Sequence, residues 1–537
     1  MTSSSAPLRY HKQLFTARAS AELDRATIET FGLPGFTLME LAATGVAAKL
    51  QAILSPSSRV LVCCGSGNNG GDALALARLL AEAGHELHIY APAGFDGLSH
   101  DAAHNLKLLQ TLKDKGTKGR IFLPDEAGEM PHNANTTFDA IIDGLFGTGL
   151  SRPVEGRFYD AISLLNRIEA PVYALDIPSG LAADSGNVMG AAVKADVTFM
   201  LGTRKRGGYL GEGPDYCGQR EFCPLPFPAY LAEEQLRRAG NERPVWLWEA
   251  SSEANIESYK KRQPAHKYQN GNVYLAAGSP GLTGAAILAA KAAWSTGCGS
   301  VAVFSPRELM PAYDAHLVEQ TRIGVSSSGD GHFNEDSAAE IMEQLRSRPG
   351  VLILGPGLGR GQQVTAFVRK LLREVESPVI LDADGFTALA SSDSLQSIHP
   401  NLPLLVTPHP GEQQRLHGRA ATTPENLQAF IRAFPCHQNM FYLAKGFPLM
   451  MGSCEHTLIT DYDSRLFNRT GYGDLLSGYI AGYLSQMVAP ETLDSMQKAA
   501  QKGLATGYEQ VMTMLLENKT PSASAILEEA ERDRPKV

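Results

Sequence analysis

Two series of short apolar runs, with helical patterns between them, constrain the fold of this chain more than any other feature. A strand that is buried on both faces has a continuous, β-branched apolar sequence, whereas a half-exposed strand alternates apolar and polar residues. Buried strands that alternate with helices are typical of layered α/β folds with parallel sheets. In the first half, a helical pattern at residues 36–54 precedes runs at residues 59–64, 86–91, 138–143, 171–176 and 195–200.

A second series begins after a change of texture at residues 213–265, which are first rich in proline and then polar and basic. We therefore predict a boundary near residues 230–255 and two α/β domains, at residues 1–235 and 250–537. The charged segment after Ser522 is expected to be a helix or a frayed end. The second series comprises residues 272–304, 351–359, 378–385, 403–412, 441–446 and 471–484.

Composition narrows the class of protein. The net charge of −9 makes a nucleic acid or an anionic membrane surface an unexpected partner. The seven cysteines lack the paired spacing of a metal site or a disulfide framework, which fits a reducing compartment. Residues 1–20 are polar, and no uncharged apolar stretch reaches the ~20 residues of a membrane span. We therefore expect a cytoplasmic protein that acts on small molecules.

The stretch "GSGNNGGDALALARLL" (residues 65–80) joins the first apolar run to a helical pattern. Glycine allows the backbone to approach a ligand closely, and the amide groups at the start of a helix attract anions. These properties favour a phosphate-bearing ligand, although the stretch is neither a Walker loop nor a clean dinucleotide fingerprint. Asp72, expected at the helix start, would repel a phosphate but could hold a hydroxyl group or a proton. A tight turn with Asp72 as the helix N-cap is the alternative interpretation.

Three carboxylates follow predicted strands of the first half: Asp72, Asp143 and Asp176. Because the carboxyl ends of parallel strands meet at one edge of a sheet, we expect these residues to gather along one crevice. Taken singly, each could be only a turn residue or a helix cap. Together, beside glycine loops, they favour a ligand site in which Asp176 donates or accepts a proton.

Two further groups accompany these carboxylates. Asn69, Asp143 and Ser179 form an oxygen-only set, which suits a hard cation better than zinc. The loop "GTGLSRP" (residues 147–153) offers backbone amides and the Arg152 guanidinium to a phosphate.

These motifs together resemble the NAD(P)H-hydrate epimerase family. "LMELAATG", "GSGNNGGDALALARLL", "IIDGLFGTGL", "ALDIPSGL" and "VTFMLGTRKRG" occur in the family's order over residues 12–225. The resemblance implies a Rossmann-like, three-layer domain that interconverts the R and S epimers of hydrated NADH and NADPH. It also implies a bound potassium ion, held by Asn69, Asp143 and Ser179. One departure is Ala73, where the family usually has glycine.

The same resemblance assigns roles to residues of this chain. Asp176 would be the acid/base at the hydrated nicotinamide carbon, and Lys205 would assist it. The residues that would bind the epimerase substrate are Asn68, Asn69, Gly70, Gly71, Asp72, Gly147, Thr148, Gly149, Leu150, Ser151, Arg152, Pro153 and Asp176.

In the second half, "GYGD" precedes a helical pattern. The amides of Gly471 and Gly473 could stabilise a transferring phosphoryl group, and Asp474 could be the base on an attacking hydroxyl. Lys445, which ends an apolar run, suits a nucleotide phosphate, and its alternative is a solvated strand end. His409, between two prolines, could bind a ligand or be structural.

The motifs "GPGLG", "LDADG", "TPHPGE", "AKG" and "GD.LSG..AG" resemble the ADP-dependent NAD(P)H-hydrate dehydratase family over residues 255–515. This family has the ribokinase-like fold and is commonly fused to the epimerase. The resemblance implies that ADP, with magnesium, phosphorylates the 6-hydroxyl of the S epimer, and that elimination restores NAD(P)H and leaves AMP and phosphate. Asp474 would deprotonate the hydroxyl. Ala285, Gly357, His409 and Asp474 would contact the hydrate, and Lys445, Gly446, Phe447, Pro448, Leu449 and Gly473 would contact the nucleotide.

One departure concerns the loop "FNRTGYGDLL" (residues 467–476). It has fewer residues between Asn468 and Asp474 than the family usually has, and it carries a tyrosine at position 472. A shorter loop implies fewer amide donors around the phosphoryl group, so a weakened or inactive dehydratase is one alternative. A ribokinase-like kinase of another small molecule is a second, although "TPHPGE" argues against it. A non-enzymatic scaffold is a third, which the retained cation set disfavours. The family resemblance also implies a homo-oligomer.

Overall fold

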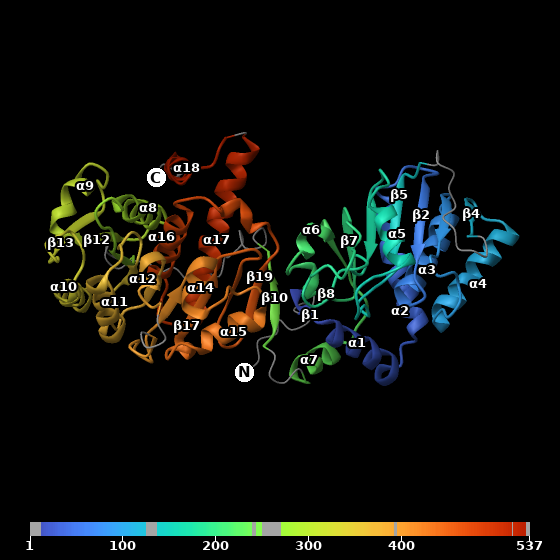
Figure 1. The fold of residues 1–537 in the computed structure, drawn as a ribbon, viewed down its shortest axis with the longest axis horizontal. Coiled ribbons are helices and arrows are strands. Elements are labelled where there is room, and N and C mark those ends of the chain that lie inside the picture. The colour runs from blue at the N-terminus through green and yellow to red at the C-terminus, as the bar shows by residue number, and fades with distance from the viewer. Residues whose placement is uncertain are drawn as a thin grey trace. The chain divides into compact units, whose positions relative to one another are not determined.

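The computed structural model describes residues 12–124, 137–238, 243–249, 270–390, 395–517 and 519–532. The chain forms two compact units that divide between Leu247 and Trp248 (Figure 1). The polar, basic segment predicted near the boundary, residues 258–271, lies almost entirely outside the described residues.

The first unit contains a seven-stranded parallel sheet with the order β4-β3-β2-β5-β6-β7-β9. The chain order reverses between β2 and β5, which makes this point the topological switch of the sheet. Two of these strands, β4 and β9, were not predicted, since β4 has three residues and β9 is only partly buried. The strands are β2 (Arg59–Cys64), β3 (Glu86–Tyr90), β4 (Arg120–Phe122), β5 (Ala140–Gly144), β6 (Val172–Leu175), β7 (Val197–Leu201) and β9 (Gln219–Cys223).

Helices cover both faces of this sheet, which gives the predicted three-layer, Rossmann-like architecture. Val60 and Val62 of β2 pack into one core with α2 and α3, while Leu61 and Cys63 pack into the other with α5. Such alternation is what a strand buried on both faces requires. The helices are α1 (Ala17–Ala26), α2 (Gly35–Gln51), α3 (Asn68–Glu82), α4 (His100–Lys115), α5 (Arg157–Leu165), α6 (Gly213–Cys217) and α7 (Ala229–Arg238).

The second sheet has ten strands in the order β10-β19-β18-β17-β16-β15-β14-β11-β12-β13, and all of them lie in the second unit except β10, within which the division between the units falls. Pairing is parallel from β17 to β13, and β18 and β19 add antiparallel pairs. The strands are β10 (Val245–Trp248), β11 (Asn272–Ala276), β12 (Ser300–Pro306), β13 (Thr321–Val325), β14 (Val351–Leu354), β15 (Val379–Leu381), β16 (Leu404–Val406), β17 (Met440–Ala444), β18 (Met450–Gly452) and β19 (Thr457–Thr460).

Helix α16 packs closely against α8. The absence of a side chain at Gly478 of α16 permits this, since a Cβ atom there would lie only 2.3 Å from the Ala289 carbonyl oxygen of α8. The segment after Ser522, which was expected to be either a helix or a frayed end, forms helix α18. No helix in the described ranges is both long and apolar enough to cross a membrane. The helices are α8 (Thr283–Ser295), α9 (Met310–Asp314), α10 (Glu335–Ser347), α11 (Gln362–Glu374), α12 (Ala383–Thr387), α14 (Pro410–His417), α15 (Pro424–Arg432), α16 (Tyr472–Ser485), α17 (Leu493–Leu516) and α18 (Ala523–Arg532).

The close approach of the loops after β2 and β5 yields a stability prediction. A Cβ atom on Gly65 would lie 1.9 Å from the Leu145 carbonyl oxygen, so Gly65→Ala must push two backbones apart. We expect it to destabilise the first unit by at least about 1–3 kcal/mol, the range for overpacking a core. Gly67→Ala is the matched control, because no atom lies within 4 Å of its Cβ position and its φ is −85°. Equal urea-unfolding midpoints for the two variants would contradict this prediction.

Candidate active sites

A cavity of about 800 Å³ lies in the first unit at the switch point between β2 and β5. The crevice outside the carboxyl ends of the strands at such a point is where open α/β sheets bind ligands. The predicted substrate-binding residues that line this cavity are Asn68, Asn69, Asp72, Gly147, Thr148, Gly149, Leu150, Ser151, Arg152 and Asp176.

Three other predicted substrate-binding residues, Gly70, Gly71 and Pro153, are not among those that line the cavity. The two glycines serve packing, because a Cβ atom on Gly70 would meet the Gly65 carbonyl oxygen at 1.9 Å and one on Gly71 would meet Met39 Cε at 2.6 Å.

The expected position of Asp72 at the helix start is wrong. Helix α3 begins at Asn68 with Gly67 as its N-cap residue, so Asp72 lies in the second turn and caps nothing. The helix runs through two glycines despite their low helix propensity, because a side chain at Gly70 would collide with the backbone of Gly65 and one at Gly71 would displace Met39. The first-turn amides of α3 therefore belong to Asn68, Asn69 and Gly70.

Hydrogen bonds link the three residues of the predicted cation set, Asn69, Asp143 and Ser179, partly through the Phe146 carbonyl oxygen. The Ser179 hydroxyl donates to Asp143 Oδ1 at 2.6 Å, and the Ser179 amide donates to Asp143 Oδ2 at 2.8 Å. Asn69 Nδ2 donates to the Phe146 carbonyl oxygen at 2.9 Å. Asn69 Oδ1 is buried and accepts no hydrogen bond from the described residues. Burial raises the pKa of Asp143 to about 6, although hydrogen bonds from Ser179 oppose the rise.

Asp176 and Lys205 form an ion pair at the end of the cavity. Lys205 is only 2% exposed, and its ammonium also donates to the carbonyl oxygens of Leu201, at 2.8 Å, and Thr203, at 3.0 Å. All three of its protons are therefore in use, and Lys205 acts by holding Asp176. Asp176 has a φ of +67°, a conformation that a non-glycine residue keeps only where its surroundings enforce it.

Two more carboxyl groups line the same cavity near this pair. Burial raises the pKa of Asp72 well above its ordinary value, and the charges of Asp176 and Asp24 add to the rise while Lys205 opposes it. Asp24, on α1, is exposed, yet desolvation by the surrounding protein and the charge of Asp176 raise its pKa to about 6, while Lys205 opposes the rise. Asp24 was not predicted, since the sequence around it has only the pattern of an amphipathic helix.

In the second unit, a charged cluster lies at the carboxyl ends of β15, β16 and β17. The Lys445 ammonium donates to Asp382 Oδ1 at 2.7 Å, and the Ser477 hydroxyl donates to Asp382 Oδ2. Asp382 is only 1% exposed. Burial alone would lower the pKa of Lys445, but the charges of Asp382 and Glu412 raise it above its ordinary value. Lys445 is therefore a half-buried, paired cation, and its interpretation as a solvated strand end is wrong.

The N-terminus of α16 meets this cluster. A Cβ atom on Gly473 would lie 3.1 Å from Lys445 Nζ, so the amide end of the helix and the lysine converge. No described oxygen accepts a hydrogen bond from the backbone amides of Gly471, Gly473 or Asp474, whereas the Tyr472 amide donates to the Arg469 carbonyl oxygen at 3.3 Å. The unpaired amides are available to an anion.

The first turn of α16 carries two predicted features, the tyrosine at position 472 and the expected base Asp474. Tyr472 is buried in an apolar cluster with Phe467, at a ring distance of 5.9 Å, and so points away from the amides. Burial raises the pKa of Asp474 to about 7, with Asp382 and Asp384 adding to the rise and Lys445 opposing it. A carboxylate with such a pKa is suited to general base catalysis near neutral pH.

His409 is the N-cap of α14 and is tied to Glu412. Its Nδ1 accepts from the Gly411 amide at 3.0 Å, and Nε2 lies 3.2 Å from Glu412 Oε1. Burial and the nearby Lys445 lower the pKa of His409, which keeps the ring neutral. Burial raises the pKa of Glu412 to about 7, and Asp382 adds to the rise. The imidazole is half-exposed and fixed, as a ligand-contacting group should be.

The other predicted contacts lie on the loops of the same sheet edge. Ala285 is half-buried in the first turn of α8, and Gly357 follows β14 with a φ of +62°, packed against the Leu282 carbonyl oxygen. In the loop after β17, Gly446 and Phe447 are half-buried, while Pro448 and Leu449 are buried.

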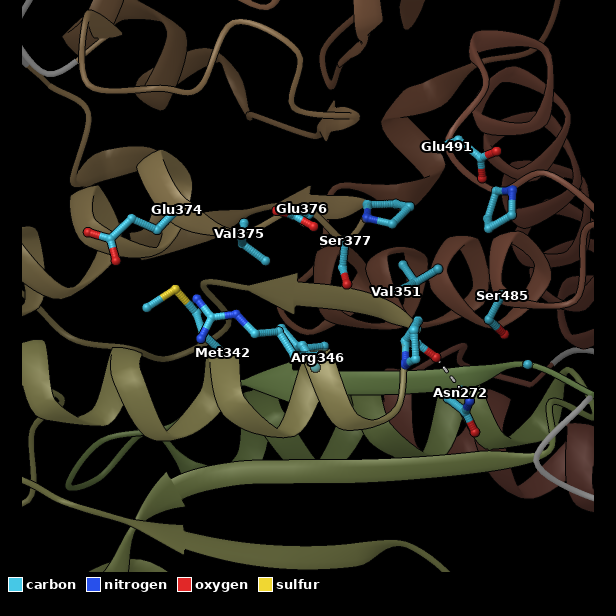
Figure 2. A pocket seen from close by; sticks show the side chains of 16 residues that line it. Asn272, Met342, Arg346, Val351, Glu374, Val375, Glu376, Ser377, Ser485 and Glu491 are labelled. Carbon is cyan, nitrogen blue, oxygen red and sulfur yellow. Dashed lines mark hydrogen bonds between the residues drawn. The ribbon is translucent and has the colours of Figure 1, made fainter.

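A second cavity, of about 510 Å³, lies at the opposite, amino-terminal edge of β11, β14 and β15 (Figure 2). Figure 2 labels Arg346, which lies near the end of α10, and Glu374, which ends α11. The Asn272 side-chain amide donates to the Pro349 carbonyl oxygen at 3.1 Å. None of the predicted site residues lines this cavity. Because open parallel sheets bind ligands at their carboxyl edge, we assign the chemistry to the cluster around Lys445.

Sequence reasoning missed four residues of these sites: Asp24, Asp382, Glu412 and Ser477. A signal existed for two of them, since the motifs "LDADG" and "TPHPGE" contain Asp382 and Glu412 directly after predicted strands. Ser477 follows Asp382 by 95 residues, and only the fold brings them together.

Comparisons with known proteins agree with this division of the chain. Residues 35–207 match the family model described as the YjeF-related protein N-terminus, and residues 273–518 match the model described as NAD(P)H-hydrate dehydratase. The bifunctional NAD(P)H-hydrate repair enzyme Nnr of Salinibacter ruber is 34% identical over 89% of this chain and 88% of its own length. The enzyme of the same name from Moorella thermoacetica is 30% identical over 89% of each chain.

The crystal structure of the ADP/ATP-dependent NAD(P)H-hydrate dehydratase from Bacillus subtilis aligns with 52% of this chain and 95% of its own, at 23% identity and a TM-score of 0.42. The matches to the two curated relatives extend over nearly the whole of both chains and span both units. On this evidence, the chain belongs to the family of bifunctional NAD(P)H-hydrate repair enzymes.

Proposed function

We propose that this enzyme repairs hydrated nicotinamide dinucleotides in two steps. The first unit interconverts the R and S epimers of hydrated NADH and NADPH. The second unit dehydrates the S epimer to NADH or NADPH with ADP, which becomes AMP and phosphate. The observation that carries the proposal is that each unit places an aspartate close to a lysine, Asp176 beside Lys205 and Asp474 beside Lys445, and that free amides at the start of α16 accompany the second pair.

In the first unit, the cavity takes the hydrated dinucleotide. The amides of the 147–152 loop and of the first turn of α3, with Arg152, hold its phosphates. Asp176, held by Lys205, exchanges protons with the oxygen on the hydrated carbon. The orphaned Asn69 Oδ1 beside Asp143 and Ser179 fits a potassium ion, since all three groups offer oxygen. Such an ion would stabilise the loops that bind the phosphates.

In the second unit, Asp474 takes the proton of the substrate hydroxyl as it attacks the β-phosphorus of ADP. The free amides of Gly473 and Asp474 and the Lys445 ammonium stabilise the transferring group. His409 and the loops at Ala285 and Gly357 contact the hydrate. Magnesium arrives with the nucleotide, since it binds phosphate oxygens with few protein ligands. The described residues contain no cluster of three acidic, histidine or cysteine side chains for a metal of its own.

The nucleotide products test this assignment. Purified enzyme with S hydrate, ADP and magnesium is expected to form AMP, phosphate and reduced dinucleotide in equal amounts. A ribokinase-like kinase of another substrate would instead consume ATP and leave the hydrate intact. Formation of a stable phosphorylated alcohol in place of the reduced ring would contradict the proposal.

The pKa of Asp474 predicts the pH dependence of dehydration. A general base works when deprotonated, so the rate should rise with pH through about 7 and fall in acid. This rise is the acidic limb of the pH–rate profile. Asp384→Asn removes a negative charge that raises the pKa of Asp474, so it should move this limb to lower pH. Asp494→Asn, on the exposed surface of α17, is the control and should leave it in place. An identical limb in all three proteins would argue against Asp474 as the base.

We further infer a cytoplasmic homo-oligomer. The family resemblance supports association between copies, and the cysteines in the described ranges are all unpaired, as a reducing compartment favours. Sedimentation of the purified chain measures the oligomeric state directly.

A further inference from the structure

Helix α1 brings a carboxyl group to the epimerase cavity from outside the region that the family model matches, residues 35–207. Two contacts fix this helix to the segment that carries Lys205. Strand β1 (Leu14–Phe15) pairs with β8 (Arg204–Lys205), and the hydroxyl oxygens of Ser20 and Thr203 are 2.6 Å apart. Asp24 follows Ser20 by one helical turn, and both line the cavity. The position of Asp24 beside the Asp176–Lys205 pair is therefore built into the fold.

Asp24 and Asp72 differ from Asp176 in their partners. Asp176 accepts hydrogen bonds from Lys205 and from the Leu201 amide. Neither Asp24 nor Asp72 has a side-chain hydrogen bond or ion pair among the described residues, and both line the open cavity. Their carboxyl groups are free to meet a ligand.

The cavity lining holds more acidic than basic side chains. Lys205 shares the cavity lining with Asp24, Asp72 and Asp176 and interacts electrostatically with the first two. Its protons are used by Asp176 and two carbonyl oxygens. Of the other charged residues in the lining, Asp101 is hydrogen-bonded to His100, and Arg152 is exposed on its loop. Carboxylates that share a partly buried site with one cation cannot all ionise freely, so a proton is retained on one of them. The raised pKa values of Asp24 and Asp72 agree with this balance.

The proposed reaction needs such a proton. In the hydrate, the carbon C6 carries a hydroxyl group beside the ring nitrogen N1. Its configuration inverts if the C6–O bond breaks, the N1 electron pair forms an N1=C6 double bond, and water adds to the opposite face. Hydroxide is a poor leaving group unless an acid protonates it, and the incoming water must lose a proton to a base. One neutral carboxyl and one carboxylate meet both requirements.

We propose that Asp24 and Asp72 share one proton and supply it to the departing C6 hydroxyl group, while the Asp176 carboxylate takes a proton from the water that adds to the other face. The group that leaves is then water, and the C6–O bond that forms replaces the one that broke. The proton gained by Asp176 returns to the pair through water in the cavity. This proposal rests on the epimerase function proposed above and adds Asp24 as a residue of that site.

The test compares Asp72→Asn and Asp24→Asn with Asp114→Asn, an exposed aspartate of α4. The full chain is given R hydrate, and the rate of S formation is followed by chromatography across pH, with binding of NADPH measured separately. Asp72→Asn should lower kcat on the order of a hundredfold or more, with NADPH binding retained. Asp24→Asn should also lower kcat. It should move the alkaline limb of the pH–rate profile to lower pH, because it removes a negative charge that raises the pKa of Asp72. Asp114→Asn should match the wild type.

The outcomes separate this inference from the function on which it rests. Wild-type rates and pH profiles in both cavity variants would overturn the shared proton and leave the epimerase function standing. A wild-type chain that does not epimerise would overturn both. If Asp72→Asn fails to bind NADPH, the alkaline limb of Asp24→Asn decides, since a purely structural role of Asp24 would not move it.

Discussion

Asp176→Asn is expected to abolish the conversion of R to S hydrate while leaving the ADP-dependent dehydration of the S epimer intact. The asparagine keeps the shape of the side chain but cannot take a proton, and general acid–base groups typically contribute on the order of a hundredfold to ten-thousandfold in rate. Lys205 would also lose its counter-ion, although it keeps the carbonyl groups of Leu201 and Thr203. The measurement is the rate of S formation from pure R hydrate.

This variant needs a fold control, because removing one partner of a buried ion pair can cost about 3–5 kcal/mol. Thermal unfolding and NADPH binding show whether the first unit is intact, and Asp160→Asn, on the exposed surface of α5, is the matched substitution. A folded Asp176→Asn variant that epimerises at the wild-type rate would remove Asp176 from the mechanism.

Asp474→Asn is expected to give the reverse result, in which epimerisation continues and ADP-dependent dehydration is lost. Asp474 lies in the first turn of α16, next to the free amides of Gly471 and Gly473.

 The asparagine retains the helix and the amides but removes the base that frees the hydroxyl for attack. The measurement is the formation of AMP and reduced dinucleotide from pure S hydrate.

Two controls accompany this variant. Asp494→Asn on the exposed face of α17 should behave as the wild type, and binding of ADP should survive in Asp474→Asn, since Lys445 and the Gly473 amide remain. Dehydration at the wild-type rate by Asp474→Asn would show that another group takes the hydroxyl proton.

Much of the fold and part of each site could be predicted from the sequence. Continuous apolar runs predicted the buried strands, and the aspartates directly after these runs indicated the carboxyl edge of each sheet. Local patterns also predicted the connected set of Asn69, Asp143 and Ser179, because all three follow strands or open a helix.

The rest depends on contacts between distant segments. Lys445 is paired with Asp382, 63 residues away, so its burial is invisible in its own neighbourhood. Asp24 lies in the cavity because β1 pairs with β8 and Ser20 contacts Thr203, 183 residues further along the chain. The start of α3 at Asn68 was missed because propensity disfavours glycine in a helix, whereas packing against the Gly65 backbone demands it at Gly70.

The most direct test of the central claim uses a mixture of R and S NADPH hydrate and follows the absorbance of the reduced nicotinamide ring, with magnesium, first without ADP and then with it. We predict no recovery without ADP and full recovery with it, since the R epimer must pass through the first site to reach the second. Recovery of the S fraction alone would contradict the proposed epimerase. No recovery, with the epimers still equilibrating, would contradict the proposed dehydratase and indicate that the loop before Asp474 no longer supports phosphoryl transfer.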